Sequence, residues 1–434
     1  MAQPHPFFLA LCFTLLSALP LHALSVYNKA TLKAHQEFIK LKISNGKPYL
    51  SQELESNPGN AAALLVANYV DFLTLCIEQD ASDFETLLLK QEKRLSQIEK
   101  LRDNSPWKSY TQAEVKMQIG VSKLLFGNRL SAAWDIRQAY LLYTSTARRY
   151  PSFIPNKKTM GMLQVLIGSV PDNYKWFLNI IGMKGSIKTG LANLRTAATQ
   201  SNPFQQEALL MYAITLHLVD QQQEQQSIKI IENLALQHPD NLLFRFVAMH
   251  LLKKTKHGEQ ALKHYISRPT GSEYLEFPYL QHMAADLYLY RGDFDRSVEH
   301  NQAFLKQHKG KHYLKAANFK LYLAYLLGGH QPQALWFYKK VSEVGTDEVE
   351  EDKYAASYVQ KQEKPVKPLM LARLQSDGGY YRESLKTLAT LDTTKAPLPV
   401  QAEYTYRKAR VYHGLQETTL AIKHYKNTIA VCGN

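Results

Sequence analysis

Hydrophobic and polar positions between Tyr279 and Gly310 alternate with the period of two amphipathic helices. In each helix the hydrophobic residues recur every three or four positions, so one stripe of its surface needs cover from a neighbour. Gly292 separates the two helices and supplies the turn between them. Small residues at Ala285 and Ser297 allow the helices to approach closely. The stretch therefore predicts a tightly packed helical hairpin.

Copies of this hairpin recur through the second half of the chain. The small residue of the second helix returns at spacings of 34, 36, 37, 50 and 37 residues, at Ser227, Ala261, Ser297, Ala334, Ser384 and Ala421. This succession resembles the tetratricopeptide repeat, whose period is about 34 residues. The resemblance implies an all-α fold, a tetratricopeptide-repeat-like α-solenoid or superhelix of helical hairpins, with C-terminal repeats over residues 203–434.

The spacing of 50 residues marks an insertion between Ala334 and Ser384. The insertion contains an acidic run, Asp347–Asp352, and a proline-punctuated stretch, Lys364–Pro368. Charge and prolines disfavour a continuous packed helix at this point. We therefore expect an acidic turn followed by a linker.

Two further regions precede the repeats. Residues 24–149 are helical by pattern and contain one repeat-like pair of helices that opens at Ser105. Residues 150–200 are predicted to form a central hydrophobic hairpin of two apolar stretches with a break at Pro171. Glycines suit close crossings of helices in this hairpin, at Gly161, Gly168, Gly182 and Gly185.

The central hairpin also carries a family resemblance. Its order of Gly, apolar helix, Ser-x-Pro break, apolar helix and Gly-x-x-Gly resembles the tetratricopeptide repeat protein 39 family of eukaryotes. It is similar as well to uncharacterised exported repeat proteins of the Bacteroidetes. These resemblances imply an all-helical repeat protein with no established catalytic residue.

The second apolar stretch of this hairpin has two interpretations. Trp176-Phe177 and Ile180-Ile181, with Lys175 and Lys184 nearby, could dip into a membrane or hold a ligand. The alternative is a buried core between repeats. We favour the core, because neither apolar stretch approaches the roughly 20 residues of a membrane span.

The N-terminus predicts export. An apolar run from Phe7 to Leu21 is followed by Ala23, so residues 1–23 suit a secretory signal peptide. No Lys or Arg precedes Phe7, which leaves an uncleaved anchor open. With the resemblance to exported Bacteroidetes proteins, the expected location is the periplasm or cell envelope of a Gram-negative bacterium.

The charge balance suggests an acidic partner. The 434 residues carry a net charge of +14, and the predicted signal contributes none of it. In an exported protein this excess suits an acidic protein or peptide, or an anionic membrane surface, and no nucleic acid is expected. The alternative is a solvated helical surface, since Lys and Arg are spread along the chain.

The chain shows no pattern typical of catalysis, a metal site or a cofactor. His308 and His312 flank two lysines without a nearby carboxylate, and the acidic run lacks the spacing of a calcium loop. No Ser lies in a nucleophile elbow. We therefore expect no catalytic residue, no metal ligand, no cofactor and no enzymatic activity.

In proteins built from this repeat, the first helix of each pair lines a binding groove. A register set by Gly292, Gly329, Gly379 and Ala421 places eight residues there: Tyr279, His282, Asp286, Phe319, Arg373, Tyr406, Arg410 and His413. Aromatics mixed with cations suit an extended acidic peptide. The alternative is that several are solvated or pack between repeats. The predicted function is a non-enzymatic exported scaffold for a protein or peptide partner, and the alternative is a peripheral module that binds anionic lipid.

Overall fold

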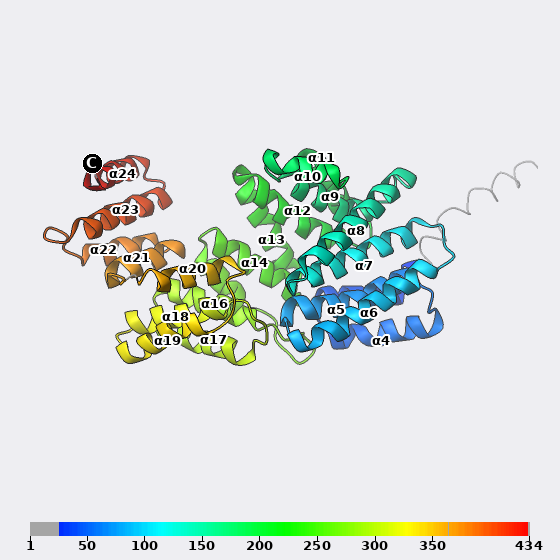
Figure 1. The fold of residues 1–434 in the computed structure, drawn as a ribbon, viewed down its shortest axis with the longest axis horizontal. Helices are drawn as coiled ribbons and strands as arrows, with labels where there is room; N and C mark the ends of the chain where they lie inside the picture. Colours follow the sequence, from blue (N-terminus) through cyan, green and yellow to red (C-terminus); the bar gives the residue numbers. More distant parts are fainter. Residues whose placement is uncertain (1–25, 363, 433–434) are drawn as a thin grey trace, which may run out of the picture. The chain divides into compact units, whose positions relative to one another are not determined.

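The computed structural model describes residues 26–362 and 364–432, so the predicted signal peptide lies outside the described residues. All regular secondary structure in those ranges is helical (Figure 1), which confirms the predicted all-α class. The chain divides into two compact units. Unit 1 comprises the chain up to Cys76, Ala81–Gln237 and Thr270–Leu275; unit 2 comprises Ile77–Asp80, His238–Pro269 and the chain from Glu276.

The helices of unit 1 pack mainly against their neighbours in sequence, α3 on α4 and α7 on α8, while α11 packs on both α9 and α12. They are α3 (Lys29–Ile39), α4 (Ile43–Ser56), α5 (Ala61–Glu78), α6 (Ala81–Lys100), α7 (Pro106–Leu125), α8 (Arg129–Arg149), α9 (Asn156–Gly168), α10 (Asp172–Ile180), α11 (Ile187–Thr199), α12 (Gln205–Val219), the short 3-10 helix η1 (Gln221–Gln223) and α13 (Glu224–Gln237).

Helix α5 is the one described helix whose length and composition would allow it to cross a membrane. Of its apolar window, 72% is buried inside the protein. Consecutive residues from Ala61 to Ala67 are all buried, so the helix is covered on every side there. Its hydrophobicity is therefore that of a core helix.

Glycines let the helices of the central hairpin cross closely at three of the four positions that the sequence predicts. A Cβ atom on Gly161 would lie 2.8 Å from the carbonyl oxygen of Gly190, so α9 and α11 touch through their backbones. An added Cβ atom would likewise lie 2.8 Å from the backbone nitrogen of Ile187 at Gly168, and 2.6 Å from the carbonyl oxygen of Gln164 at Gly185. Gly182 differs, because nothing lies within 4 Å of its added Cβ; it follows α10 and has a φ of +72°.

Two residues of helix α10, Trp176 and Ile180, correct the expectation that the second apolar stretch of this hairpin is a buried core. Trp176 is 63% exposed and Ile180 is 72% exposed, one helical turn apart. Leu178 of the same helix is partly buried. Helix α10 (nine residues) therefore presents at least these two apolar side chains, Trp176 and Ile180, at the surface.

Unit 2 continues the pattern of adjacent helix pairs, with α14 on α15, α16 on α17, α18 on α19, α21 on α22 and α23 on α24. Its helices are α14 (Leu242–Lys254), α15 (Gly258–Ile266), α16 (Tyr279–Arg291), α17 (Phe294–Gln307), α18 (Leu314–Leu327), α19 (Gln331–Glu343), α20 (Glu350–Gln360), α21 (Lys367–Asp377), α22 (Tyr381–Ala389), α23 (Leu398–Gly414) and α24 (Thr418–Cys432).

The small residues that set the repeat spacing are all buried, which confirms the predicted register of the hairpins. Their exposed fractions are 0% for Ser227, Ala261, Ser297, Ala334 and Ser384, and 4% for Ala421. Between helices, the Ser384 hydroxyl of α22 donates to the carbonyl of Ala372 in α21 at 2.7 Å. Small side chains at these points therefore permit the close approach of each pair.

Glycine turns separate the helices of three pairs, as predicted. Gly292, Gly329 and Gly379 have φ angles of +87°, +88° and +81°. This left-handed conformation is strained for residues with a Cβ atom, so glycine suits the end of each first helix.

The insertion contains a helix that the sequence did not predict. Its acidic residues Glu350, Glu351 and Asp352 form the first turn of α20, where negative charge is favourable to the helix dipole. Ala355 and Tyr358 of α20 are buried in the hydrophobic core of unit 2. The expected acidic turn is therefore in part a packed helix.

Candidate functional site

The eight residues predicted to line a groove fall in different environments, although all belong to first helices in unit 2. His282 and Asp286 are fully buried, and Phe319 is 4% exposed. Three of the others, Arg373, Tyr406 and Arg410, line one surface pocket. The structure thus divides the predicted set between the interior and the surface.

Phe319 lies in the core because α20 covers it. Its ring contacts the ring of Tyr354 in an edge-on arrangement at 5.7 Å and that of Tyr358 at 4.8 Å, both in α20. The sequence assigned Phe319 to an open groove because it did not predict this helix. Phe319 therefore presents no surface to a peptide.

Two further predicted residues contact neighbouring side chains. Tyr279 packs against Tyr313 with ring centroids 4.6 Å apart, and burial raises the pKa of its phenol well above the usual value. His413 is exposed, and its Nδ1 lies 3.3 Å from the hydroxyl of Tyr425 in α24. Neither residue is among those that line the pocket of Arg373 and Arg410.

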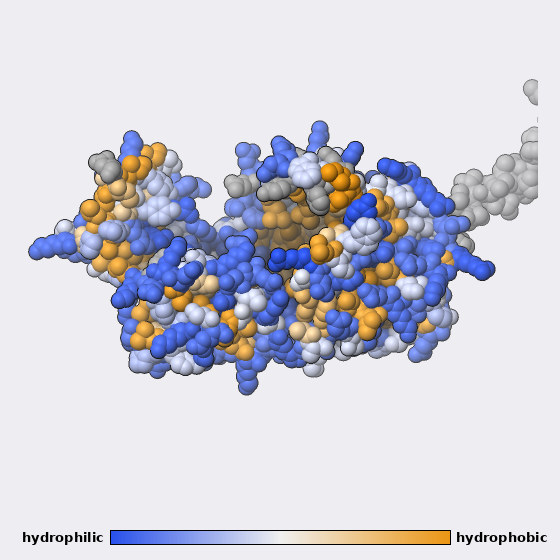
Figure 2. Space-filling view, in the orientation of Figure 1, coloured by the Kyte–Doolittle hydropathy of each residue, from blue (hydrophilic) through white to orange (hydrophobic). Residues whose placement is uncertain are grey.

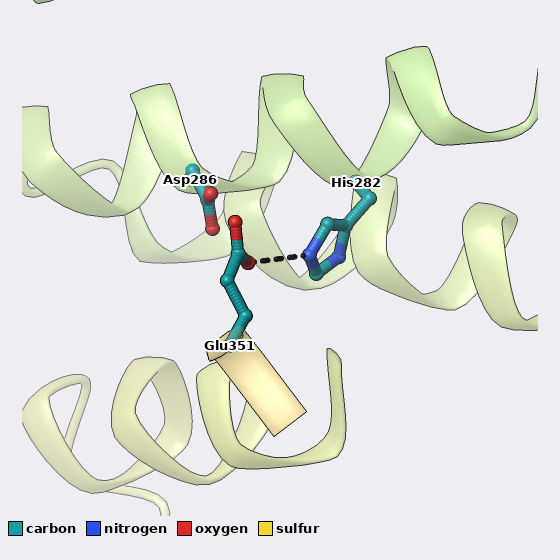
Figure 3. A group of neighbouring side chains, drawn as sticks. All are labelled: His282, Asp286 and Glu351. Atoms are coloured by element: carbon teal, nitrogen blue, oxygen red, sulfur yellow. Dashed lines mark hydrogen bonds and ion pairs between the residues drawn. The ribbon is translucent and has the colours of Figure 1, made fainter. Parts of the chain in front are cut away.

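His282 and Asp286 belong to a cluster of five charged or titratable side chains, here called the unit 2 charge cluster. The other members are Lys253 of α14, Lys320 of α18 and Glu351 of α20. Lys320 Nζ lies 2.5 Å from Asp286 Oδ1 and 2.6 Å from Glu351 Oε2, and Lys253 pairs with Asp286. Figure 3 shows the Glu351 side chain reaching toward His282, whose Nε2 is 3.1 Å from Glu351 Oε2.

Attraction between opposite charges in the cluster offsets the free-energy cost of burying each charged group. Burial alone would raise the pKa of the Asp286 carboxyl, but Lys253 and Lys320 hold that pKa below its usual value. Burial would lower the pKa of Lys253, yet Asp286 and Glu351 raise it well above normal. For His282, burial and then the Lys320 ammonium lower the imidazole pKa. The cluster therefore holds two ammonium groups, two carboxylates and a neutral imidazole.

The same cluster contains three potential metal ligands, but their environment does not suit a metal ion. His282, Asp286 and Glu351 each offer one ligand atom, all within 4.8 Å of one another. Lys253 and Lys320 already bind both oxygens of Asp286 and balance the two carboxylates. A divalent cation would add charge beside two ammonium groups. We interpret the cluster as structural.

We expect His282 to make unit 2 less stable in mild acid. Its folded-state pKa lies below the unfolded value, so the unfolded chain binds the proton more tightly, and stability falls as pH drops below about 6.5. The measurement is the free energy of unfolding in urea at several pH values, for wild type and His282→Gln. The slope between pH 6.5 and 5 should decrease in the variant, by at most about 1.4 kcal/mol per pH unit. Equal slopes in the two proteins would contradict the prediction. His300 and His308 titrate in both proteins, so the difference in unfolding free energy at each pH removes their contribution.

The surface pocket, here called the arginine pocket, lies between α21 and α23 and has a volume of about 360 Å³. It is lined by Arg373, Ser376, Asp377, Tyr406, Arg407 and Arg410. On each helix the first and last lining residues are four positions apart, Arg373 and Asp377 on α21 and Tyr406 and Arg410 on α23, so they lie on the same side of that helix and face the pocket.

Two of the three arginines in the pocket have partners. Arg407 donates from Nη2 and Nε to Glu403 Oε1 at 2.8 Å and 3.2 Å. Arg373 donates to the hydroxyl of Tyr354 at 2.5 Å, and its Nε lies 3.7 Å from Asp377 Oδ2. Arg410 is exposed and makes no hydrogen bond or ion pair with any residue that the structure describes.

Positive charge therefore exceeds negative charge in the arginine pocket. Three guanidinium groups line it with one carboxylate, Asp377. The positive charge of Arg410 also acts on Lys256. Burial is the main cause that lowers the pKa of Lys256, and repulsion from Arg410 lowers this pKa further. An anion would find an unpaired guanidinium here.

Sequence reasoning missed several of the residues in these two sites. Arg407 lies next to Tyr406 and one turn before Arg410, so its position in the helix was the only signal for it. Lys253, Lys320 and Glu351 gave no local signal, because they meet His282 or Asp286 only through the packing of four helices.

Comparisons with known proteins add a distant likeness. No family model matches the chain, and no curated protein matches it in sequence. The human IFIT1 dimer with m7Gppp-AAAA has 13% identity and a TM-score of 0.40, over 93% of this chain and 89% of its own. The human IFIT1 dimer with PPP-AAAA has 14% identity and a TM-score of 0.39, over 92% and 89%. The resemblances to the tetratricopeptide repeat protein 39 family and to Bacteroidetes proteins stay predictions.

Proposed function

We propose that the protein is a non-enzymatic scaffold that binds an acidic segment of a protein or peptide partner in the arginine pocket. The observation that carries this proposal is Arg410, an exposed guanidinium with no ionic partner among the described residues, beside Arg373, Arg407 and the ring of Tyr406. A carboxylate of the partner would supply the missing negative charge.

The chemistry of the pocket suits recognition of such a segment. Arginine can hold a carboxylate through two parallel hydrogen bonds. Tyr406 is 40% exposed and adds apolar area beside the charges. A volume of about 360 Å³ accommodates one or two side chains, so one acidic residue would be the anchor of a longer contact.

A binding role also fits the protonation chemistry of the pocket. Arginine stays protonated in proteins, so three of the six lining side chains can bind an anion without transferring a proton. Their positive charges persist over the whole physiological pH range. We therefore expect binding that depends on salt, because added ions screen the attraction.

Export to the periplasm or cell envelope of a Gram-negative bacterium is part of the proposal. It is supported by the apolar run Phe7–Leu21, which precedes Ala23. The partner would then be an acidic protein or peptide of the same compartment.

The double variant Arg373→Ala/Arg410→Ala tests the proposal. The probe is a fluorescently labelled peptide of alternating Glu and Leu, and fluorescence anisotropy gives its Kd. We expect each substitution to weaken binding about tenfold, because about 1.4 kcal/mol is lost with each charged contact. Arg410→Lys keeps the charge but not the paired hydrogen bonds, and should give an intermediate loss.

The control is Arg382→Ala, which removes the same charge from an exposed position of α22 outside the pocket. Its Kd should change less than twofold. If the double variant binds the peptide as tightly as wild type, the pocket is not the binding site. If its melting temperature collapses, the two arginines are structural and the proposal fails.

A further inference from the structure

Unit 1 carries a stripe of exposed apolar residues along α8. Leu130 is 90% exposed, Trp134 is 61% exposed and Leu141 is 36% exposed. Spacings of four and seven residues place all three on one face of the helix. Such a face is costly to leave in water and ordinarily marks an interaction surface.

The C-terminal end of α10 lies near this stripe. Arg137 of α8 donates from Nε to the carbonyl of Ile181, the residue that follows α10, at 2.7 Å. Tyr140, one turn further along α8, donates to the carbonyl of Lys184 at 2.8 Å and accepts from its amide at 3.0 Å. These bonds join the middle of α8 to residues 181 and 184, just after Ile180, the last residue of α10, so the C-terminal end of α10 lies near the stripe.

Together the five exposed residues form what we call the tryptophan patch: Leu130, Trp134, Leu141, Trp176 and Ile180. Figure 2 shows hydrophobic and near-neutral side chains at the surface in the region of α10, beside strongly hydrophilic ones. The patch includes two tryptophans, Trp134 of α8 and Trp176 of α10. Tryptophan is enriched where a protein meets the membrane–water interface, because its ring is apolar and its N–H is polar.

The rim of the tryptophan patch is basic. Lys184 and Lys188 follow α10 and are exposed, and neither side chain has an ion pair with any described residue. The guanidinium of Arg137 lies 5.5 Å from the ring centre of Trp134. Of the acids on these two helices, Asp135 is neutralised by Lys123 at 2.9 Å, and Asp172 lies in the first turn of α10, away from its lysine-flanked end.

We propose that the tryptophan patch docks unit 1 on the surface of an anionic lipid bilayer. The two tryptophans would enter the interface, and Lys184 and Lys188 would lie against anionic headgroups, where each cation contributes attraction. Helix α10 has nine residues and is too short to span a bilayer, so the contact is peripheral. The site is separate from the arginine pocket, and neither proposal requires the other.

Flotation of the full chain with vesicles tests this inference. One set contains phosphatidylcholine with phosphatidylglycerol, and the other contains phosphatidylcholine alone. We expect binding to the anionic vesicles with a blue shift of tryptophan fluorescence, and little binding to the neutral ones. Trp134→Ser/Trp176→Ser should reduce binding at least about tenfold. The variant loses the favourable free energy of transferring two large apolar side chains from water into the membrane interface.

Matched controls separate the patch from general effects. Trp336→Ser removes a tryptophan that is 54% exposed in unit 2, and should leave vesicle binding unchanged. Lys184→Gln/Lys188→Gln should reduce the preference for anionic over neutral vesicles. Arg373→Ala/Arg410→Ala should float as wild type, which distinguishes this site from the arginine pocket.

Three outcomes would overturn the inference. The first is unchanged flotation of the double tryptophan variant with its circular dichroism intact. The second is equal binding to neutral and anionic vesicles. The third is a dimer in light scattering that becomes a monomer in the double variant while wild type ignores vesicles, because a second copy of the chain would then cover the patch.

Discussion

Lys158→Ala should destabilise unit 1 by about 3–5 kcal/mol, a large part of the total stability of a typical domain. Lys158 is 0% exposed, and its Nζ lies 3.2 Å from Glu114 Oε2 and 3.2 Å from Glu207 Oε2. Removing the ammonium leaves two carboxylates in the interior without their cation. The loss therefore comes mainly from uncompensated charge, and only in part from the cavity.

The groups around Lys158 come from five different helices, α3, α5, α7, α8 and α12. His35 of α3 places Nε2 2.7 Å from Glu207 Oε1, and Tyr69 of α5 donates to Glu207 Oε2 at 2.9 Å. Glu114 of α7 accepts from Tyr143 of α8 at 2.8 Å. Burial would raise the pKa of Glu207, but Lys158 and then His35 bring it down to about 2. The network is thus satisfied only when all its members are present.

Chemical denaturation followed by circular dichroism measures the loss, and acid supplies a second readout. In wild type, Glu207 contributes stability above pH 4.5 that is lost as pH falls toward 2, because its folded pKa lies below the unfolded one. Without Lys158, burial dominates and the folded pKa rises. The variant should then lose less stability in acid than wild type does.

Two comparisons make the prediction decisive. Lys157→Ala alters the adjacent, partly exposed lysine of α9 and should change stability by less than about 0.5 kcal/mol. Lys158→Met/Glu114→Gln/Glu207→Gln removes all three charges at similar volume and should recover most of the loss. A loss below about 1 kcal/mol for Lys158→Ala would show that water reaches the network.

Local signals in the sequence explain why the hairpins could be predicted. Gly292, Gly329 and Gly379 each end a first helix, and each requires only its own backbone conformation. Ser297 and Ala334 had to be small because the partner helix crosses there, and the repeat spacing reveals such positions. Register could therefore be assigned without any knowledge of long-range contacts.

The charge networks could not be predicted, because their meaning depends on contacts between distant residues. Lys158 follows Lys157 in an amphipathic helix and reads as a surface lysine until Glu114 and Glu207 are packed against it. Asp286 likewise occupies a groove position in the repeat register. Lys253 and Lys320, from neighbouring helices, convert that position into an interior one.

The pocket of Arg373 and Arg410 was partly foreseen, for a related reason. Both residues lie on first helices, α21 and α23, so the register that aligned the glycines also aligned these side chains. Phe319 was placed by the same register and proved to be in the core, because α20 intervenes. An insertion between repeats is thus the point at which the periodic argument fails.

Asp286→Ala should destabilise unit 2 by about 3 kcal/mol, because Lys253 and Lys320 would share Glu351 as their remaining carboxylate. Glu351 has a side chain that is 35% exposed, whereas that of Asp286 is 0% exposed. Water therefore assists one carboxylate and not the other. Glu351→Gln should cost clearly less than Asp286→Ala.

Hydrogen exchange localises the effect of Asp286→Ala. Protection should fall in α14, α16, α18 and α20, the four helices that supply the cluster, while unit 1 keeps its protection. Glu299→Ala, an exposed acid of α17, is the control and should change stability by less than about 0.5 kcal/mol. Since Asp286 has a folded pKa below 3.8, its contribution is present above that pH and lost below it, and the variant should lack this acid-dependent loss. A variant as stable as wild type, with unchanged exchange in these four helices, would mean that the cluster does not stabilise their packing.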